Sequence, residues 1–457
     1  KILFTGNDIT QDHVLRREMR QFEGAWTSDN AIEAGKVRLE RLGYFKEVNV
    51  ETIPVPGTDD QIDISYSVEE ETTGSIGGNI GYSDFGLMLG FNLQEQNFLG
   101  SGNTVGIGIN KNVYSEMYNI SYMNPYATRD GVSLGYNLYF RETDYGEFNV
   151  ANYLTNSSGF GAQFGYPISD ITRLGFNITY DKTDIDIGSL PAREIYDFVS
   201  VEGNIFETLS AQLSWQRVTL NRGLFPTDGA STVLSVSSTI PGSDLSYYRL
   251  NVRQRYYQPL TQNLVFGFQG ELGYLDAYGD TEETPFFQNF YAGGPRSLRG
   301  FESNTLGPRS TDAPCYEFNY AEGTCPNLLD TDGDGELDTP YYNPYANQTS
   351  RYRDAPIGGN IKIEGSLQLI FRLPFIEDQR SLRSAFFFDF GNVFSDNCKD
   401  YQINCSEPSV DDLRYSYGVG LTWITGFGPM SLAIAKPTNA GPRERTEEFQ
   451  FTVGNVF

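Results

Sequence analysis

The side chains best suited to bind an ion lie in one acidic segment of the C-terminal half. The segment reads Asp-Thr-Asp-Gly-Asp-Gly-Glu-Leu-Asp, and its acidic residues are Asp330, Asp332, Asp334, Glu336 and Asp338. Acids at alternate positions, with glycine at the sixth, are typical of the opening of an EF-hand calcium loop. The twelfth position, which supplies a bidentate glutamate in that motif, is Tyr341 here. The segment predicts a partial, weak calcium site, and a solvated acidic loop is the alternative.

The four cysteines form two pairs that are close in the sequence. Cys315 is near Cys325, and Cys398 is near Cys405. Both pairs fall in long loops that we expect on the same, outward side of the fold. They therefore predict two local disulfides in an oxidising compartment. A zinc site that uses all four cysteines is the alternative, but no Cys-x-x-Cys spacing supports it.

Composition and motifs exclude several classes of function. The chain has 457 residues with 33 basic and 59 acidic side chains, so its net charge is −26. This charge argues against a nucleic-acid partner, which needs a basic surface. The sequence contains no GxxxxGK[ST] phosphate loop and no HExxH zinc motif, and His13 is its single histidine. We therefore expect no enzymatic activity and no resident cofactor other than the candidate calcium ion.

Residues 1–71 are predicted to form a small α+β domain. A short strand is expected at residues 1–7, helices at 10–21 and 28–42, and alternating strands at 44–53 and 61–69. The order is therefore β-α-α-β-β, in a size that is normal for a domain. A polar hinge at residues 69–74 follows. The chain begins at Lys1 without a methionine, and we expect it to be a mature or trimmed piece of a longer protein.

Residues 74–457 alternate between apolar and polar side chains. Leu174, Phe176, Ile178 and Tyr180, for example, alternate with polar or charged residues. A period of two over about ten residues matches a membrane-spanning β-strand, whereas no apolar run reaches the ~18 residues of a transmembrane helix. Roughly sixteen such strands are present, an even number as in bacterial barrels. The sequence predicts a mainly β fold with a roughly 16-stranded antiparallel transmembrane barrel; a soluble β-sandwich is the alternative.

Charges, aromatic residues and loop lengths favour the barrel. Arg249, Arg253 and Arg255 share one strand face, as in a polar lumen, and we interpret the aromatic residues at 286–291 as part of an interfacial girdle. Long connections alternate with tight turns, which is the outer-membrane pattern. The long connections are residues 141–157, 183–206, 278–357 and 395–412.

Several motifs together resemble the BamA family of outer-membrane assembly factors. They are Arg-Arg-Glu-Met-Arg at 16–20, Gly-Leu-Phe-Pro-Thr-Asp-Gly at 223–229, Phe-Tyr-Ala-Gly-Gly at 290–294 and Leu-Arg-Gly-Phe at 298–301. Residues 1–71 resemble the last periplasmic POTRA module of that family, and 74–457 resemble its barrel. The resemblance implies ATP-independent folding and insertion of β-barrel proteins into the bacterial outer membrane. It also implies three partners: the lipid bilayer, unfolded β-barrel clients, and assembly lipoproteins of the BamD type at the periplasmic domain.

The resemblance also implies an ion pair inside the barrel. In the family, the motif that corresponds to Arg299, Gly300 and Phe301 lies on a long loop tucked into the lumen. Alternation along 382–390 turns Asp389 into the lumen, where it matches the family's acidic partner of the loop arginine. A second acidic partner corresponds to Gln368, which is neutral here. We expect Gln368 to accept one hydrogen bond at most, and an ordinary lumenal acid is the alternative for Asp389.

The first and last strands are predicted to form a weak lateral seam. Gly77, Gly78 and Gly81 weaken the first strand, because glycine adds chain entropy and packs nothing. The last strand carries Phe451, Val453 and Phe457, with Gly454 near its end. An opened seam would offer unpaired backbone groups to an incoming strand. The alternative is that glycine is simply common in this chain, which has 48.

Two further predictions depend on the resemblance. Arg16 and Glu23 match family positions that contact a lipoprotein partner, and a solvated charge pair is the alternative. A TamA-like assembly factor and a two-partner-secretion transporter pore share the architecture and remain the alternative functions. A passive porin would lack the domain at residues 1–71.

Overall fold

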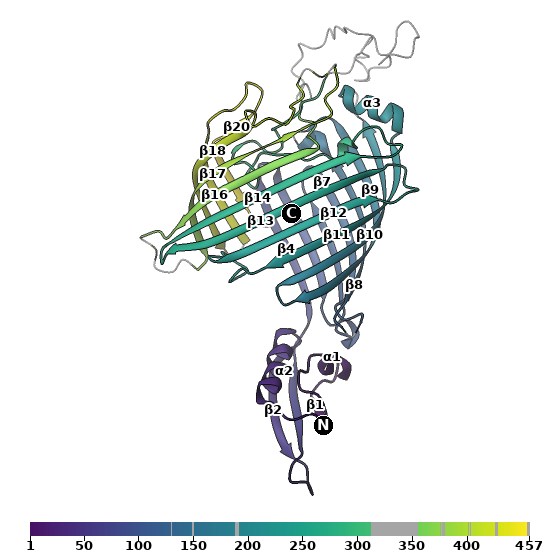
Figure 1. The fold of residues 1–457 in the computed structure, drawn as a ribbon, viewed down its shortest axis with the longest axis vertical. Helices are drawn as coiled ribbons and strands as arrows, with labels where there is room; N and C mark the ends of the chain where they lie inside the picture. Colours follow the sequence, from purple (N-terminus) through teal and green to yellow (C-terminus); the bar gives the residue numbers. More distant parts are fainter. Residues whose placement is uncertain are drawn as a thin grey trace.

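The computed structural model describes residues 1–128, 130–148, 150–187, 192–311, 355–374, 376, 380–400, 402, 404–425 and 428–454. It has a small α+β domain at one end of a closed β-barrel (Figure 1). The predicted fold class is therefore confirmed. The barrel end next to the N-terminal domain is called the proximal end below, and the opposite end the distal end. The predicted Cys315–Cys325 pair, the acidic segment 330–338 and Phe457 lie outside the described residues.

The N-terminal domain is a three-stranded sheet covered by two helices. Its elements are β1 (Ile2–Thr5), α1 (Asp12–Arg17), α2 (Asp29–Arg41), β2 (Phe45–Pro54) and β3 (Ile62–Glu70), with the sheet order β1-β3-β2. Strand β1 is parallel to β3, and β2 is antiparallel to it. The buried core includes Leu15, Leu39 and Tyr66. The domain therefore has its own apolar core, as the sequence pattern predicts.

The first helix is shorter than predicted. It ends at Arg17, because the side chain of Gln21 organises the following segment as a loop. The Gln21 amide donates to the carbonyl oxygens of Phe22 and Trp26 and accepts from the backbone N–H of Ser28. Thr10, where the predicted helix begins, lies before the observed helix and accepts a hydrogen bond from Asn97 of the barrel. Both differences come from contacts that a helical pattern does not reveal.

The barrel contains sixteen antiparallel strands in a closed ring. The first eight are β4 (Gly74–Ser83), β5 (Gly86–Glu95), β6 (Thr104–Lys111), β7 (Ser115–Asn124), β8 (Ser133–Asp144), β9 (Tyr153–Ser169), β10 (Thr172–Ile187) and β11 (Ile205–Val218). The others are β12 (Gly229–Thr239), β13 (Tyr247–Thr261), β14 (Leu264–Ala277), β16 (Ile361–Phe371), β17 (Leu382–Phe394), β18 (Arg414–Thr425), β19 (Gly428–Pro437) and β21 (Phe449–Val453). Two short strands, β15 (Gly300–Phe301) and β20 (Thr446–Glu447), pair with each other outside the ring.

The outer surface of the barrel is apolar. On β5, Leu87, Leu89, Phe91 and Leu93 are exposed at every second position, and most other strands repeat this pattern. An exposed apolar belt of this kind is typical of a barrel surrounded by lipid. Among the described residues, no helix is long and apolar enough to cross a membrane.

Loops at the distal end pack into a dome. Helix α3 (Arg193–Glu202) is part of it and was not predicted, since the segment 183–206 was expected to be a loop. Its buried residues Ile195 and Phe198 contact the aromatic residues of the neighbouring loops. Phe286 is buried in the dome. Phe290 is buried in a second apolar cluster, which also contains Leu298 and Phe301. The prediction that residues 286–291 form a lipid-facing girdle is therefore wrong, because these rings pack against other loops.

Candidate functional site: the barrel seam and the loop that contacts it

Among the described residues, the seam between β4 and β21 has the shortest pairing in the ring. Its register contains a single pair, Val453 with Tyr82. On the other side of β4, the pairing with β5 runs from Gly74–Glu95 to Ser83–Gly86 along the whole strand. Strand β21 is only five residues long. Most of the β4 edge that faces β21 therefore lacks a strand partner in the described part of the chain.

The glycines predicted at the seam do not have equal roles. Gly454 adopts φ +80°, and a Cβ atom there would lie 2.6 Å from the carbonyl oxygen of Ile80. This contact requires glycine, because a side chain would separate the two strands. Gly78, in contrast, has nothing within 4 Å of its Cβ position, and Gly77 has only one atom there, at 4.0 Å. Gly454 sets the close approach of the seam strands, whereas Gly77 and Gly78 lie in open space.

Arg299 and Asp389 form a bidentate ion pair inside the barrel. The Arg299 Nε and Nη2 atoms each donate to one carboxylate oxygen at 2.7 Å, and the backbone N–H of Arg299 donates to the same carboxylate at 3.3 Å. The guanidinium carbon lies 3.4 Å from the ring centre of Phe387. Asp389 is 0% exposed. A buried carboxylate is stable only when it is paired, so this arrangement fixes the position of the loop.

Ser366, and not Gln368, is the neighbouring strand's contact with Arg299. The Arg299 Nη2 atom donates to Ser366 Oγ at 3.0 Å, and the Gln368 amide donates to that same oxygen at 3.3 Å. Gln368 therefore does not occupy the second-partner position that the sequence suggested. The reason is register, because Ser366 is directly opposite Asp389, whereas Gln368 is opposite Phe387. Glu364, farther along the strand, accepts a hydrogen bond from Ser297 of the loop.

The residues that follow Arg299 contact the last strand. Gln450 of β21 accepts from the backbone N–H of Gly300 at 3.3 Å and donates to the carbonyl of Phe301 at 2.8 Å. Strand β15 pairs with β20, just before β21 in the chain. Gly300 has φ +91°, and a Cβ atom there would lie 3.2 Å from Ala435. The motif Arg299-Gly300-Phe301, called the anchor motif below, thus connects β17 to β21.

The same loop also reaches the other side of the seam. The hydroxyl of Ser303 donates to the carboxylate of Asp84 in the turn between β4 and β5. Glu302 forms an ion pair at 3.4 Å with Arg445, the residue that precedes β20. Residues 299–303 therefore contact both strands of the seam or their hairpins, which the sequence analysis did not predict.

The N-terminal domain joins the barrel through the inner half of its Arg-Arg-Glu-Met-Arg motif. The Arg17 guanidinium lies 4.5 Å from the ring centre of Tyr126, a residue of the proximal turn between β7 and β8. Buried Glu18 pairs with Arg38 at 2.7 Å, and Arg38 also donates to the Tyr126 hydroxyl at 3.0 Å. The Gln11 backbone N–H donates to Gly100 of another proximal turn. These contacts set the position of the domain under the barrel.

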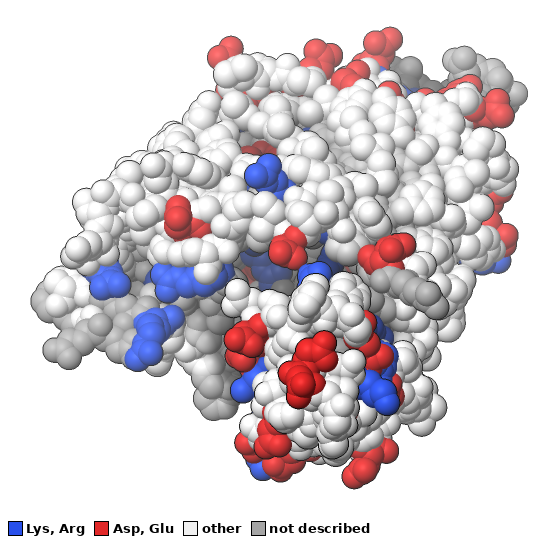
Figure 2. All heavy atoms as spheres, turned by 60° about the horizontal axis from the view of Figure 1, so that its bottom comes forward, with Lys and Arg blue, Asp and Glu red and all other residues white. Residues whose placement is uncertain are grey.

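The outer half of that motif lies on the exposed surface. Arg16 and Glu23 are 3.2 Å apart, and both are about half exposed. The N–H of Ile2 and the Arg16 guanidinium donate to the Glu23 carboxylate and lower its pKa. Two aromatic residues are exposed on the same segment, Phe22 at 76% and Trp26 at 97%. Figure 2 shows acidic and basic side chains interspersed over this domain.

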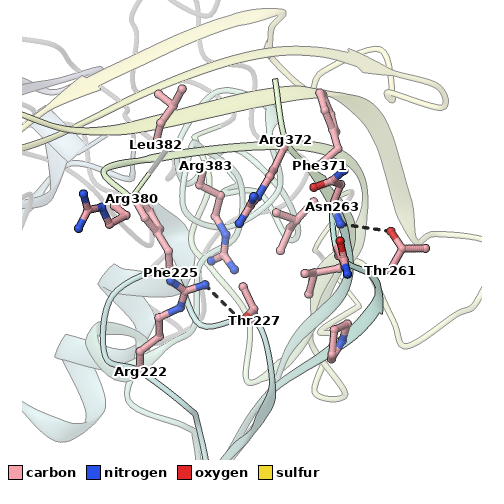
Figure 3. Close-up of a pocket in the computed structure, with 14 residues that line it drawn as sticks. Arg222, Phe225, Thr227, Thr261, Asn263, Phe371, Arg372, Arg380, Leu382 and Arg383 are labelled. Atoms are coloured by element: carbon pink, nitrogen blue, oxygen red, sulfur yellow. Dashed lines mark hydrogen bonds between the residues drawn. The ribbon is translucent and has the colours of Figure 1, made fainter. Parts of the chain in front are cut away.

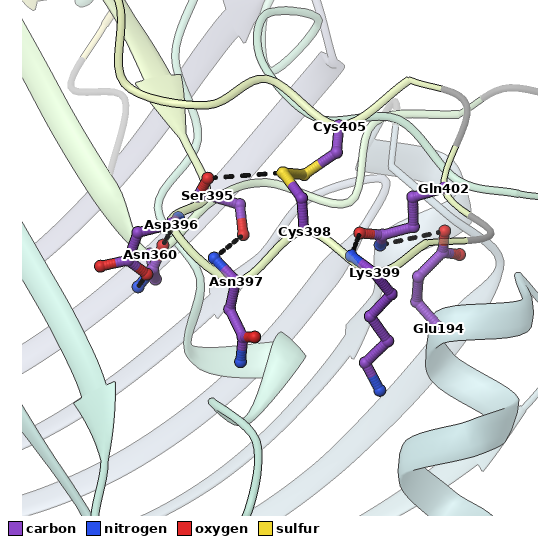
Figure 4. The surroundings of a disulfide bond; sticks show 9 residues. All are labelled: Glu194, Asn360, Ser395, Asp396, Asn397, Cys398, Lys399, Gln402 and Cys405. Carbon is purple, nitrogen blue, oxygen red and sulfur yellow. Dashed lines mark hydrogen bonds between the residues drawn. A yellow bond between two sulfur atoms is a disulfide. The ribbon is translucent and has the colours of Figure 1, made fainter.

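The Cys398–Cys405 disulfide is present, in a distal loop that contacts α3 (Figure 4). Between the two cysteines, the Gln402 amide donates to Glu194 of α3 at 3.3 Å. Glu194 also accepts from the backbone N–H of Thr311. Burial of Glu194 raises its pKa. The disulfide loop is therefore part of the dome. No group of three metal-ligating side chains is present in the described part of the chain.

Comparisons with known proteins agree with this architecture. Residues 97–457 match the Omp85 superfamily domain, and residues 1–71 match the POTRA family described as a surface antigen variable number repeat. The chain belongs to the Omp85 superfamily. Within it, the crystal structure of BamA from Haemophilus ducreyi lacking POTRA domains 1-3 is 31% identical, with a TM-score of 0.81. That match covers 99% of this chain and 83% of the BamA chain, so this Omp85 protein is a member of the BamA family.

Curated relatives of this BamA-family chain are longer. The outer membrane protein assembly factor BamA of Neisseria meningitidis is 29% identical over 100% of this chain and 56% of its own length. The chain thus spans little more than half of that relative. The sorting and assembly machinery component 50 homolog of Bos taurus is 23% identical over 93% of this chain and 82% of its own length. CdiB from Escherichia coli, at 12% identity and a TM-score of 0.59, shares the fold alone.

Sequence reasoning missed the anchor motif's partner on the last strand. Gln450 is 2% exposed and lies between Phe449 and Phe451, which share the opposite strand face. Its polar side chain at a lumenal position is a signal that alternation alone could have supplied. Ser303 and Asp84 carry no such signal, because their contact joins two loops that are far apart in the chain.

Proposed function

We propose that this BamA-family protein folds β-barrel proteins and inserts them into the bacterial outer membrane without ATP. The barrel lies in the outer membrane, and the POTRA domain and the proximal end face the periplasm. The observation that carries the proposal is the seam, where one register pair joins β4 to β21 within the described residues. Membership of the BamA family supports it, since the named relatives are outer membrane assembly factors.

The exposed edge of β4 is the surface on which a client strand pairs. In lipid, unpaired N–H and C=O groups cost several kcal/mol each, so a free edge favours pairing with any available strand. A client strand that adds to β4 satisfies these groups by β-augmentation. The apolar side chains of β4 that face outward, Ile76 and Ile80, are exposed where such a strand would lie. The next client strands extend the sheet into the bilayer.

The anchor motif controls how far β21 separates from β4. Arg299 is fixed to β17 by Asp389, and Gly300 and Phe301 bind Gln450 of β21. Lateral opening therefore has to break the Gln450 contacts or move the loop together with β21. Ser303 adds a contact to the β4–β5 turn. The loop closes the seam at rest and releases it when a client strand competes for the edge.

The exposed half of the POTRA domain is the surface for an assembly lipoprotein. Arg16 and Glu23 supply an oriented charge pair, and Trp26 supplies a large aromatic side chain that contacts solvent. Exposed aromatic and arginine side chains are the residues most enriched at protein–protein hot spots. A BamD-type lipoprotein at this surface would connect the domain to the rest of an assembly complex.

A cysteine staple across the seam tests the proposal. Tyr82→Cys and Val453→Cys replace the one register pair of the seam in the full-length protein, reconstituted with its partner lipoproteins in liposomes. The rate of folding of a urea-unfolded small barrel protein is read by heat-modifiable gel shift. We expect the oxidised staple to reduce the rate to that of empty liposomes, and reductant to restore it.

The matched control is a staple inside an ordinary ladder. Asn177→Cys and Gln163→Cys replace a register pair of β9 and β10. This control should accelerate client folding as the wild type does, in both redox states, which also accounts for reduction of the native Cys398–Cys405 disulfide. Full acceleration by the oxidised seam staple would overturn the proposed role of the seam.

A further inference from the structure

A cavity at the proximal rim of the barrel gathers arginine side chains. It measures about 610 Å³ and lies between the β11–β12, β13–β14 and β16–β17 connections (Figure 3). Four arginines line it: Arg222, Arg372, Arg380 and Arg383. None of the described lining residues is acidic, although the whole chain has 59 acidic and only 33 basic side chains. Figure 2 shows basic side chains gathered on the proximal rim beside the POTRA domain.

Two of these arginine side chains, Arg222 and Arg383, are oriented by neutral partners. The Arg383 Nη2 atom donates to the carbonyl of Pro226 at 2.5 Å, and its guanidinium lies 4.9 Å from the ring centre of Tyr257. The Arg222 Nη2 atom donates to Thr227 Oγ1 at 3.3 Å. Arg383 is also hydrogen-bonded to the Tyr257 side chain. None of these contacts neutralises the positive charge, and a guanidinium has five N–H donors. Arg222 and Arg383 therefore each keep N–H donors for a bound group.

The three connections bring these charges to one place. In Figure 3 the guanidinium groups of Arg222, Arg372 and Arg383 converge on the same space, whereas that of Arg380 points away from it. Arg372 directly follows β16, and its backbone N–H donates to Asn263 of the β13–β14 turn. Like charges placed this closely repel one another unless an anion lies between them. Guanidinium groups bind phosphate oxygens in bidentate geometry, so a phosphate group fits this arrangement.

The cavity also borders the lipid-facing surface. Phe371 and Leu382, which line it, belong to the outward faces of β16 and β17. The Phe371 ring stacks on Phe386 at 4.8 Å, and Phe386 is an exposed residue of the apolar belt. Leu382 is opposite exposed Trp423 in the register. A ligand with a phosphate group beside an acyl chain would contact both the arginines and this apolar rim.

We propose that the cavity binds the phosphate group of an anionic phospholipid in the periplasmic leaflet. The inference rests on the proposed placement of the proximal end at that leaflet. The bound phospholipid holds the proximal rim of the barrel at the periplasmic leaflet. Client strands enter the barrel wall from that leaflet. The strand order places β17 three strands from β21, so the bound lipid lies on the C-terminal side of the seam.

Lipid binding to the full-length protein tests this inference without any client. The purified protein is exchanged into micelles that contain equal amounts of phosphatidylglycerol and phosphatidylcholine, and retained lipid is measured by native mass spectrometry. We expect the wild type to retain phosphatidylglycerol preferentially. Arg222→Gln with Arg372→Gln should reduce the preference about tenfold, as the loss of charge-assisted hydrogen bonds predicts. Because surface charges are screened, the preference should also fall as salt rises.

The control is a pair of arginines at the same barrel end that do not line the cavity. Arg173→Gln with Arg217→Gln, at the start of β10 and the end of β11, should leave the preference unchanged. Heat-modifiable gel shift establishes that every variant is folded. Equal loss in both double variants, or no preference in the wild type, would overturn the inference even if client folding remains active.

Two further binding measurements distinguish a phospholipid from other anions as the ligand of the cavity. Inorganic phosphate at millimolar concentration should compete only weakly with phosphatidylglycerol, since it lacks the acyl chains that contact Phe371 and Leu382. Tight binding of inorganic phosphate alone, with no lipid preference, would assign the cavity to a free anion and contradict the proposal. Binding of an acidic peptide in place of the lipid would contradict it equally.

Discussion

Strands β9 and β10 pair along their whole length, from Ile187–Tyr153 to Thr172–Ser169, whereas β21 and β4 share one pair among the residues that the structure describes. In the first region, backbone hydrogen bonds alone close the sheet. In the second, a loop contacts both sides of the seam: Arg299 fixes it to β17, Gln450 of β21 binds its backbone, and its Ser303 donates to Asp84 beside β4. The comparison shows two kinds of closure in one barrel, and the proposed lateral opening would occur at the second, where only a short ladder has to break.

The largest expected effect is loss of the buried ion pair. Arg299→Ala leaves Asp389 buried without its partner, which should destabilise the barrel by about 3–5 kcal/mol. We expect a lower heat-modification temperature and a loss of client folding. The control, Arg253→Ala, removes a 64% exposed partner of Glu271 and should cost at most about 1 kcal/mol. Equal effects of the two variants would show that the anchor motif has no special role.

The contact between the loop and the last strand is expected to be next in size. Gln450→Ala removes the acceptor of the Gly300 N–H and one of two donors to the Phe301 carbonyl, which still accepts from the N–H of Gly294, at a cost of about 1–3 kcal/mol. Crosslinking between cysteines placed on β4 and β21 would measure how often the seam separates, and it should become slower. The control is Gln212→Ala, which removes a lumenal hydrogen bond to Asn177 within an ordinary ladder. Its seam crosslinking should equal that of the wild type.

A smaller effect is expected from the glycine at the seam. Gly454→Ala places a Cβ atom against the Ile80 carbonyl at a residue with positive φ, which should cost about 1–2 kcal/mol and separate the strands. Gly78→Ala has open space around its Cβ position and should be neutral or slightly stabilising. Thermal gel shift of both variants checks the difference. Similar melting of the two would mean that β21 does not approach β4 this closely.

The smallest effect is expected on the POTRA domain. The pKa of Glu23 is lowered first by the Ile2 N–H and then by Arg16, so its stabilising contribution is present above the ordinary carboxyl value of 4.5. That contribution is lost as pH falls through the lowered value. Amide exchange of β1, corrected for its intrinsic pH dependence, should therefore increase at low pH. Glu23→Gln should remove the pH dependence; if the mutant keeps it, another group is responsible.

The sequence predicted the strands and faces of the barrel well because alternation reports one strand at a time. Asp389 was assigned to the lumen because it alternates with the outward-facing residues of its strand, and it is fully buried there. Gln368 was also placed on the lumenal face, but the residue opposite Asp389 is Ser366. Register between two strands depends on both of them, so a single-strand pattern cannot supply it.

Loop structure could not be read in the same way. Helix α3 was missed because its apolar residues pack against distal loops that are distant in the sequence. The aromatic residues at 286–291 were assigned to a membrane girdle for the same reason, although Phe286 lies in the dome. The anchor motif was located through family resemblance, whereas its contacts with Gln450 and with the β4–β5 turn needed the three-dimensional arrangement.

Hydrogen exchange at the seam tests the central claim most directly. In membrane-embedded protein, we predict faster amide exchange in β21 and β4 than in β9 and β10, because one register pair joins the seam strands in the described part of the chain. Arg299→Ala should increase exchange in β21 and leave β9 and β10 unchanged. Equal protection of the two regions in the wild type, or no response of β21 to Arg299→Ala, would contradict the account that the loop closes the seam.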